Sequence, residues 1–408
     1  MEEWKEYKLG EVCNMIPGFA FKSKDFGSGK DIAIKIKDIC PPYVETKEAD
    51  NVEISNYNPE KLLKFVVRKG EFLLAMTGAT IGKIGRYICE EPAYVNQRVL
   101  KFEDAGLISY DYLYYYLSTN VFRSFILNHI DSQSAQPNIS STTIGKYPIK
   151  APNIKEQNRI ASILKSLDDK IEVNRKINEN LEQQAQALFK SWFVDFEPFK
   201  GGEFVESELG MIPNGWNVGK LEDILELRRD NIRKEDKWDY PYLPIDIIPM
   251  HSLGIYDFKS NDEAQSSLQL FEKNDIVIGA MRVYFHRVVI APQKGITRNT
   301  CFVLRPKNDN SLAFSVLLCN TEDAISFASR TSKGSTMPYS VWEGGFNTYK
   351  FPCPPNNVIA DFDKLCKPYL ERIRDAYKEN VRLASLRDTL LPRLMSGELK
   401  VNEIENAI

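Results

Sequence analysis

The sequence predicts an α+β protein in which two duplicated α/β domains are separated by a long two-helix antiparallel coiled coil, with approximate two-fold symmetry. Three observations predict this fold class: a heptad stripe in the middle of the chain, a second heptad stripe at its C-terminal end, and an internal repeat that relates the two halves. Apolar residues that recur every 3.5 positions are typical of helices that pair along a narrow seam.

The first heptad stripe lies between Asn153 and Phe196. Its seam positions alternate in spacing by three and four residues: Ile160, Leu164, Leu167, Ile171, Asn174, Asn178, Leu181, Ala185, Leu188 and Trp192. Asn153, followed three residues later by Glu156, predicts a capping box at the start of a helix. A helix of this length extends roughly 55–60 Å and needs a partner to cover its narrow stripe.

The second stripe runs from Asn357 towards the C-terminus and predicts that partner helix. Its seam positions are Ile359, Phe362, Cys366, Tyr369, Ile373, Ala376, Asn380, Leu383, Arg387, Leu390 and Leu394. Pro368 should kink this helix or shift its start. Arg387 places a charge on the seam, so the neighbouring Leu386 is the alternative core residue. The competing interpretation is that the two stripes are ordinary core helices of separate domains.

The second half of the chain restates the first at an interval of about 200–212 residues. Trp4 and Leu9 match Trp216 and Leu221, and residues 70–102 have a weaker echo in 274–305. A repeat of this length indicates a duplicated domain followed by its helix. The predicted organisation is a first domain over 1–152, a central helix over 153–196, a linker over 197–211, a second domain over 212–356, and a C-terminal helix and tail over 357–408.

Short apolar runs bounded by turn residues predict strands in both domains. These runs are Ile32–Ile36, Phe72–Met76, Ile84–Ile88 and Tyr94–Phe102 in the first domain, and Ile276–Gly279, Val283–Ile290 and Thr300–Leu304 in the second. One helix is expected after the strands of each domain, over 109–127 and over 312–329.

Composition places the chain among ordinary globular proteins, with 43% hydrophobic and 27% charged residues. An acidic N-terminus and the lack of long apolar runs predict a cytoplasmic protein without a membrane segment. The seven cysteines show no paired spacing, and the three histidines, His129, His251 and His286, lie far apart in the sequence, so no metal site is expected. A net charge of −3 argues, taken alone, against a nucleic-acid partner.

Catalytic motifs are incomplete in this sequence. Cys40-Pro41-Pro42-Tyr43 resembles an adenine-methyltransferase motif but lacks the Asn or Asp at its first position. Residues 78–84 imitate a phosphate-binding P-loop, but they are one residue short and end in Ile where Ser or Thr binds magnesium. The sequence therefore predicts no catalysis and no cofactor.

Locally basic, Gly/Thr-rich turns suggest nucleic-acid contacts despite the acidic total. Residues 60–101 carry eight Lys or Arg against four Asp or Glu. Residue types that contact phosphates and base edges select these candidates in the first domain: Thr77, Thr80, Lys83, Arg86, Gln97, Arg98, Ser134, Gln136 and Asn138. The corresponding candidates in the second domain are Arg282, Tyr284, His286, Arg287, Arg298, Asn299, Lys333, Ser335 and Thr336. The alternative for each residue is a solvated surface charge or an ordinary turn.

The long helices carry apolar side chains beyond what a two-helix seam needs, which suggests a surface for a partner protein. These candidates are Phe189, Trp192, Phe193, Phe196, Leu390 and Leu394. The alternative is that they pack inside the chain.

Four segments carry a family resemblance: residues 152–171, 188–199 (LFKSWFVDFEPF), 212–224 and 386–401 (LRDTLLPRLMSGELKV). Over its whole length the chain resembles the specificity subunit of type I restriction-modification enzymes. The resemblance implies two target recognition domains, each reading one half of a bipartite sequence in double-stranded DNA, and a coiled coil that sets the spacer and docks two modification (methyltransferase) subunits.

The resemblance also implies a subunit without catalysis of its own, since the assembled complex, with its restriction subunits, methylates adenine and cleaves DNA. The alternative is a non-enzymatic scaffold or adaptor with two binding domains on a helical rod. A third possibility, a self-contained methyltransferase, is opposed by the missing motif.

Overall fold

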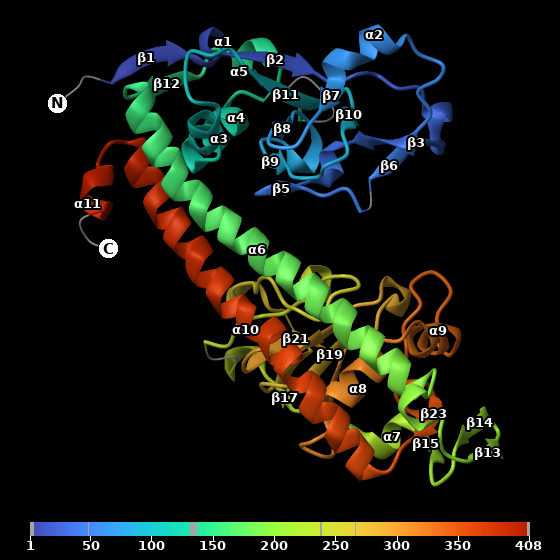
Figure 1. Ribbon diagram of the computed structural model, residues 1–408. Helices are drawn as coiled ribbons and strands as arrows, with labels where there is room; N and C mark the ends of the chain where they lie inside the picture. Colours follow the sequence, from blue (N-terminus) through green and yellow to red (C-terminus); the bar gives the residue numbers. More distant parts are fainter. Residues whose placement is uncertain (1–3, 48, 131–136, 237–238, 266, 406–408) are drawn as a thin grey trace. The chain divides into compact units, whose positions relative to one another are not determined.

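The computed structural model describes residues 4–47, 49–130, 137–236, 239–265 and 267–405 (Figure 1). The chain divides into two compact units. The first unit comprises Met1–Asp168 and Leu386–Ile408, and the second comprises Asp169–Ser385. Each unit therefore holds one α/β domain together with a stretch of both long helices.

The two heptad stripes form helices α6 (Ile154–Phe193) and α10 (Asn356–Met395), each of 40 residues. Helix α6 begins where the capping box predicts, because the Asn153 side chain accepts a hydrogen bond of 3.0 Å from the Glu156 N–H. Helix α10 begins well before Pro368, so the expectation that this proline shifts the start is wrong.

The two helices pair antiparallel, as side-chain contacts within each unit show. In the second unit, the Asn174 amide donates to the Asn380 side chain at 2.8 Å, and the Asn178 amide donates to the Ile373 carbonyl at 3.3 Å. In the first unit, Arg387 forms an ion pair with Asp168, with 2.7 Å between the guanidinium nitrogen and the carboxylate oxygen. The coiled coil is thus confirmed, and the interpretation as unrelated core helices is wrong.

Arg387 itself occupies the seam. Leu386, the alternative core residue, has a 46% exposed side chain. The Leu386 alternative is therefore wrong, because Asp168 on the facing helix provides a partner for the charge of Arg387.

Within its described residues, the first unit contains three sheets. A two-stranded sheet pairs β1 (Lys5–Lys8) with β12 (Pro148–Ala151). A four-stranded sheet has the order β6 (Asp50–Val52), β3 (Phe26–Ile34), β10 (Ala93–Val95) and β7 (Val66–Val67). A six-stranded sheet has the order β2 (Cys13–Pro17), β11 (Val99–Asp104), β8 (Phe72–Ala75), β9 (Ile84–Tyr87), β5 (Tyr43–Val44) and β4 (Ile39–Cys40).

Short helices complete the first unit. They are α1 (Leu9–Val12), α2 (Pro59–Leu62), α3 (Tyr110–Leu117), α4 (Asn120–Asn128), α5 (Ser141–Ile144) and α11 (Val401–Glu405). Ile160 and Leu164 of α6 and Leu394 of α10 are buried in the same core as the tyrosine-rich α3. The start of α6 and the end of α10 therefore belong to the fold of this domain.

The part of the second unit that the structure describes contains four sheets. Two are two-stranded, pairing β13 (Phe204–Ser207) with β14 (Gly210–Pro213) and β15 (Asn217–Lys220) with β23 (Lys350–Cys353). The third has the order β16 (Leu225–Leu227), β22 (Cys301–Pro306), β19 (Ile276–Gly279) and β20 (Val288–Ile290). The fourth has the order β17 (Asn231–Ile232), β18 (Leu268–Phe271) and β21 (Gly295–Arg298). Its helices besides α6 and α10 are α7 (Leu221–Ile224), α8 (Leu312–Cys319) and α9 (Glu322–Arg330).

The sequence repeat is a repeat of topology. The order β2-β11-β8-β9 in the first unit is matched by β16-β22-β19-β20 in the second. Leu9 and Leu221, paired by the sequence repeat, each begin a one-turn helix and are fully buried. The α+β fold class with two domain repeats and a long helix pair is therefore confirmed.

Two local expectations are wrong. Residues 109–127 and 312–329 each form two helices, because Thr119 and Thr321 cap α4 and α9 by accepting a backbone N–H. Residues 283–290 do not form one strand, because Arg282 and His286 adopt left-handed backbone conformations around a short turn, η9 (Val283–Phe285), and β20 begins only at Val288.

Candidate nucleic-acid interface

A groove in the first unit, here called the Arg98 groove, gathers several of the sequence-predicted residues. It has a volume of about 540 Å³ and is lined by Pro17, Met76, Thr77, Gln97, Arg98, Asn138, Ile139, Ser140 and Ser141. The residues come from the end of β2, from the segment just after β8, from the turn between β10 and β11, and from the start of α5 with the segment that precedes it. Four candidates, Thr77, Gln97, Arg98 and Asn138, are therefore brought together. Ser134 and Gln136 lie outside the described residues.

A short backbone ladder builds one wall of this groove. The Ile139 N–H donates to the Met76 carbonyl and the Gly78 N–H donates to the Pro137 carbonyl, both at 3.1 Å. Gly78 has φ +76°, which only glycine adopts readily. The Thr77 hydroxyl donates to the Pro137 carbonyl at 2.8 Å and so acts within the fold. The side chains of Gln97, Arg98 and Asn138 are exposed on this framework.

The remaining candidates of the first unit lie elsewhere. Arg86 is ion-paired with Asp111, and its guanidinium lies 4.2 Å from the Tyr114 ring centroid. Lys83 lines a separate cavity of about 200 Å³ that Arg123 also lines. The buried hydroxyl of Thr80 has no hydrogen-bond partner among the described residues. Arg86 therefore has an internal role, and Lys83 lies outside the Arg98 groove.

The second unit repeats the same ladder with different side chains. The Ser340 N–H donates to the Ala280 carbonyl at 2.8 Å, and the Arg282 N–H donates to the Pro338 carbonyl at 2.7 Å. Arg282, with φ +51°, thus stands where Gly78 stands in the first unit. The two units present equivalent turns with a glycine in one and an arginine in the other.

The exposed face of this second turn carries polar and aromatic side chains. The exposed candidates are Arg282, Tyr284, Asn299, Lys333, Ser335 and Thr336. The Arg282 Nε donates to the Tyr284 hydroxyl at 2.6 Å. Met337 and Tyr339, which the sequence analysis did not select, are also exposed on the same loop. The sequence indicated these two residues only through their position directly after the candidate loop Lys333-Gly334-Ser335-Thr336.

Three candidates of the second unit are not on this face. His286 is 4% exposed, and its Nε2 lies 2.9 Å from the Asn320 side-chain oxygen. Arg287 and Arg298 are half-buried, and their Nε atoms have no hydrogen-bond partner in the described part of the chain. Burial lowers the pKa of Arg287. His286 closes the turn η9 and Arg287 follows it, whereas Arg298 lies on β21.

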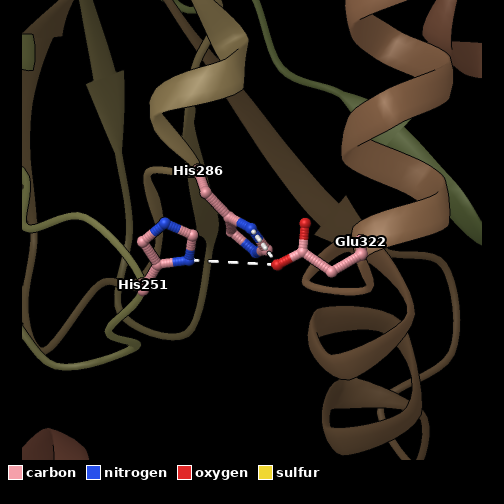
Figure 2. A group of neighbouring side chains, drawn as sticks. All are labelled: His251, His286 and Glu322. Atoms are coloured by element: carbon pink, nitrogen blue, oxygen red, sulfur yellow. Dashed lines mark ion pairs between the residues drawn. The ribbon is translucent and has the colours of Figure 1, made fainter. Parts of the chain in front are cut away.

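The histidines do not lie as far apart as the sequence suggests. The ring centroids of His251 and His286 are 4.6 Å apart, and both rings face Glu322 (Figure 2). The third histidine, His129, lies in the first unit with its Nδ1 2.8 Å from the Phe125 carbonyl. His251 and His286 are therefore neighbours in the fold although they lie 35 positions apart in the sequence.

The aromatic residues proposed for partner binding pack inside the chain. Phe189 and Phe193 are buried among Phe314 and Phe362, and Trp192 and Phe196 pack partly buried against the same core. Leu394 is buried and Leu390 half-buried in the core of the first unit. This is the alternative that the sequence left open, and it follows from the docking of each helix end onto a domain.

The two stretches that resemble catalytic motifs, residues 40–43 and 78–84, have structural roles. Residues 78–80 form a 3-10 turn that leads into strand β9, whereas a P-loop leads into a helix. The Pro42 carbonyl accepts hydrogen bonds from the Arg86 N–H and the Tyr114 hydroxyl, both at 2.9 Å. Both motifs are thus turns of the first domain.

Within the described ranges, the chain contains no helix that is both long and apolar enough to cross a lipid bilayer.

The fold defines a class: a protein of two similar α/β domains, each with an equivalent turn and each packed against a stretch of both long helices. The model of the type I restriction modification DNA specificity domain matches residues 1–183 and 213–362, so the chain belongs to this family. The family that the sequence resemblance indicates is therefore confirmed.

Known relatives match almost end to end. The chain is 29% identical to the type I restriction enzyme MjaIX specificity subunit of Methanocaldococcus jannaschii, over 98% of both chains. It is 23% identical to the HindI specificity subunit of Haemophilus influenzae, over 98% of this chain and 100% of the relative. A crystal structure of the type I S subunit from M. genitalium matches with a TM-score of 0.53 at 15% identity, over 96% of each chain, which shows a shared fold.

Proposed function

We propose that this specificity subunit binds double-stranded DNA through two surfaces, one on each domain, and that each surface reads one half of a bipartite target. The observation that carries the proposal is the duplicated ladder: exposed Gln97, Arg98 and Asn138 lie on it or beside it in one unit, and exposed Arg282, Tyr284 and Lys333 do so in the other. Arg and Gln side chains recognise guanine and adenine edges in the major groove, and Lys binds phosphates.

The two domains share a topology but expose different side chains. This suits the proposed function, because two half-sites of different sequence can be read by the same backbone framework with two different sets of side-chain contacts. We take residues 1–152 and 212–356 as the two reading domains. Residues 153–196 and 357–408 are then the spacer helices, with 197–211 as the connection between the halves.

The proposal includes partners but no catalysis by this chain. Two modification subunits would bind the helix pair, and restriction subunits would join through the assembled complex. Methylation and cleavage then belong to those subunits in the cytoplasm. The names of the relatives as specificity subunits of restriction enzymes support a division of labour of this kind.

A salt-dependent duplex-binding experiment tests the proposal. The purified chain is titrated with a randomised duplex library, with and without its modification subunits, and the bound sequences are read. We expect a bipartite target and an affinity that falls as salt rises, because Lys and Arg release counterions from the phosphates. A variant with Arg98→Ala should lose affinity about tenfold and relax selection within one half-site.

Arg393→Ala is the matched control, because it removes the same charge from an exposed position outside both turns. Equal binding by wild type and Arg98→Ala would remove the Arg98 groove from the interface. Failure of the complete complex to select any sequence would favour the scaffold alternative. Methyl transfer by the isolated chain would contradict the assignment of catalysis to partners.

A further inference from the structure

Three side chains from separate segments of the second unit converge on one point (Figure 2). His251 lies in the loop after η7 (Ile245–Ile247), His286 closes the turn η9, and Glu322 is the first residue of α9. One ligand atom from each of the three lies within 4.8 Å of the others. The Nδ1 of His286 is 3.2 Å from the Glu322 Oε1, and the Nδ1 of His251 is 4.0 Å from the same oxygen.

The hydrogen bonds of His286 define which of its nitrogens is available. Its Nε2 lies 3.1 Å from the Asn320 carbonyl and 2.9 Å from the Asn320 side-chain oxygen. A carbonyl oxygen can only accept, so Nε2 carries the proton and donates it. In the neutral ring, Nδ1 then presents a lone pair towards the Glu322 carboxylate.

This Nδ1 is buried and has no hydrogen-bond partner among the residues that the structure describes. A lone pair that faces a carboxylate oxygen at 3.2 Å is repelled by it, because both atoms are acceptors. A cation between the two atoms turns this repulsion into coordination. The His251 ring brings a second nitrogen to the same point.

We propose that His251, His286 and Glu322 bind a divalent transition-metal ion of the Zn²⁺ class. Two imidazole nitrogens and one carboxylate form a set that suits zinc, with a fourth position left to solvent. Tetrahedral zinc with ligands at about 2.0–2.2 Å places neighbouring ligand atoms roughly 3.3–3.6 Å apart. The His286–Glu322 separation is already close to this range, and the exposed side chains of His251 and Glu322 can adjust.

The surroundings of His286 fit a metal ligand. Metal-binding histidines usually donate their second ring N–H to a carbonyl or carboxylate, which fixes the ring orientation. The Asn320 carbonyl occupies that position on Nε2. In addition, the His251 N–H donates to the His286 carbonyl at 2.9 Å, so the backbones of two ligands are already joined.

The ion would fix the recognition turn of the second domain. The turn from Arg282 to His286 carries Tyr284 on its exposed face and His286 on its buried end. Coordination would attach this end to the start of α9 and to the His251 loop. Metal occupancy would thus order the side chains that we propose contact DNA.

The site belongs to the second domain alone. Gly82 stands where His286 stands, since the Ala75 N–H donates to the Lys83 carbonyl just as the Gly279 N–H donates to the Arg287 carbonyl, both at 2.9 Å. Helix α4 begins with Asn120, whereas α9 begins with Glu322. The first domain therefore offers neither ligand at the equivalent place.

Zinc titration of the full-length chain tests the proposal. The chelator-stripped protein competes for Zn²⁺ with a chromophoric chelator, and bound metal is counted by elemental analysis. Wild type should bind one ion per chain. His251→Ala and Glu322→Gln should each bind at least ~10-fold more weakly. Both substitutions are at exposed positions, so the variants should fold.

Two matched controls address other zinc ligands. His129→Ala removes the remaining histidine, and Cys40→Ser removes an exposed thiol; both variants should bind zinc as wild type does. Zinc binding that is unchanged in Glu322→Gln and His251→Ala would overturn the proposal, as would wild type that binds no zinc in the competition.

Amide hydrogen exchange gives a second readout. Zinc should slow exchange within residues 282–286 in wild type but not in Glu322→Gln, because coordination suppresses local opening. Equal exchange in wild type with and without one equivalent of zinc would refute the attachment of this turn by metal.

Discussion

At the scale of single residues, Glu182 on α6 shows how burial makes a side chain sensitive to pH. Its carboxylate is 5% exposed and accepts hydrogen bonds of 2.9 Å from the Ser252 hydroxyl and the Leu253 N–H. Burial nevertheless raises the pKa of Glu182 to about 6, above its ordinary value of 4.5. Between these pH values the folded chain binds more protons than the unfolded chain.

Stability should therefore fall as pH rises from about 4.5 to about 6, by an amount near 2 kcal/mol from this residue alone. Glu182→Gln keeps the two accepted hydrogen bonds and removes the charge. We expect it to stabilise the second unit at pH 7 by about 1–2 kcal/mol and to flatten the pH dependence. Urea unfolding at pH 5 and pH 7 measures both effects.

Glu206→Gln is the control, because Glu206 is exposed on β13 and should leave the difference between the two pH values unchanged. A Glu182→Gln variant that is less stable than wild type at pH 7 would show that the carboxylate is needed in its charged form.

Single residues also show the limit of sequence reasoning about the site. Arg86 and Arg98 look alike in a basic stretch, yet Arg86 pairs with Asp111 while Arg98 lines the groove. The difference depends on which face of the sheet α3 covers. That information lies in residues far along the chain, so residue type and local charge could select the stretch but not the contacting side chain.

At the scale of elements, the helix pair carries polar contacts where an apolar seam would be more usual. In the first unit, Asp168 is 10% and Arg387 17% exposed, and Asp168 also accepts a hydrogen bond of 2.8 Å from the Tyr115 hydroxyl. In the second unit, Asn174 and Asn380 form a buried pair. Polar seam residues of this kind reduce stability but fix the register of paired helices.

Replacing one member of the Asp168–Arg387 pair should lower the free energy of unfolding more than replacing both members. Arg387→Leu leaves a nearly buried carboxylate without its partner and should destabilise the first unit by about 2–4 kcal/mol. Adding Asp168→Asn should recover a large part of the loss, because the amide carries no charge and still accepts from Tyr115. Chemical denaturation of the two variants and of Asp168→Asn alone closes the cycle.

If the stability losses of Arg387→Leu and Asp168→Asn simply add in the double variant, the two side chains are not coupled. Arg393→Leu, which changes an exposed arginine of the same helix, should alter stability by less than about 0.5 kcal/mol and serves as the reference.

The elements themselves were predictable where their pattern is long. The 40-residue helices follow from a seam repeated over several heptads, and the sequence predicts the N-terminal cap of α6 at Asn153. The shorter helices were merged in the prediction, although Thr119 and Thr321 are ordinary N-cap residues. Only two residues separate the paired helices, and so short an interruption leaves the apolar pattern of the sequence looking continuous.

At the scale of the whole molecule, the function that we propose depends on helices of fixed length. One heptad added to both α6 and α10 at facing positions, beside Asn178 and Ile373, lengthens each helix by about 10.5 Å and preserves the pairing. If the helix pair sets the interval between the two reading domains, the spacer between half-sites should grow by about 3 base pairs.

Selection of bound duplexes by the assembled complex, followed by sequencing, measures the spacer. The control adds the heptad to α6 alone, which breaks the facing pairs and should impair assembly. An unchanged spacer in the doubly extended chain would show that the helices do not set the interval.

The sequence by itself determined the duplication, the two long helices and the family. The helices follow from a local heptad periodicity, and the duplication and the family follow from short segments that can be recognised in the sequence alone. The tertiary structure decided which side chains of the basic turns reach the surface, that Phe189 and Phe193 are core, and that His251, His286 and Glu322 meet. Such outcomes depend on strand register, left-handed turns and the helices that cover each sheet. These bring together residues whose proximity no local pattern records.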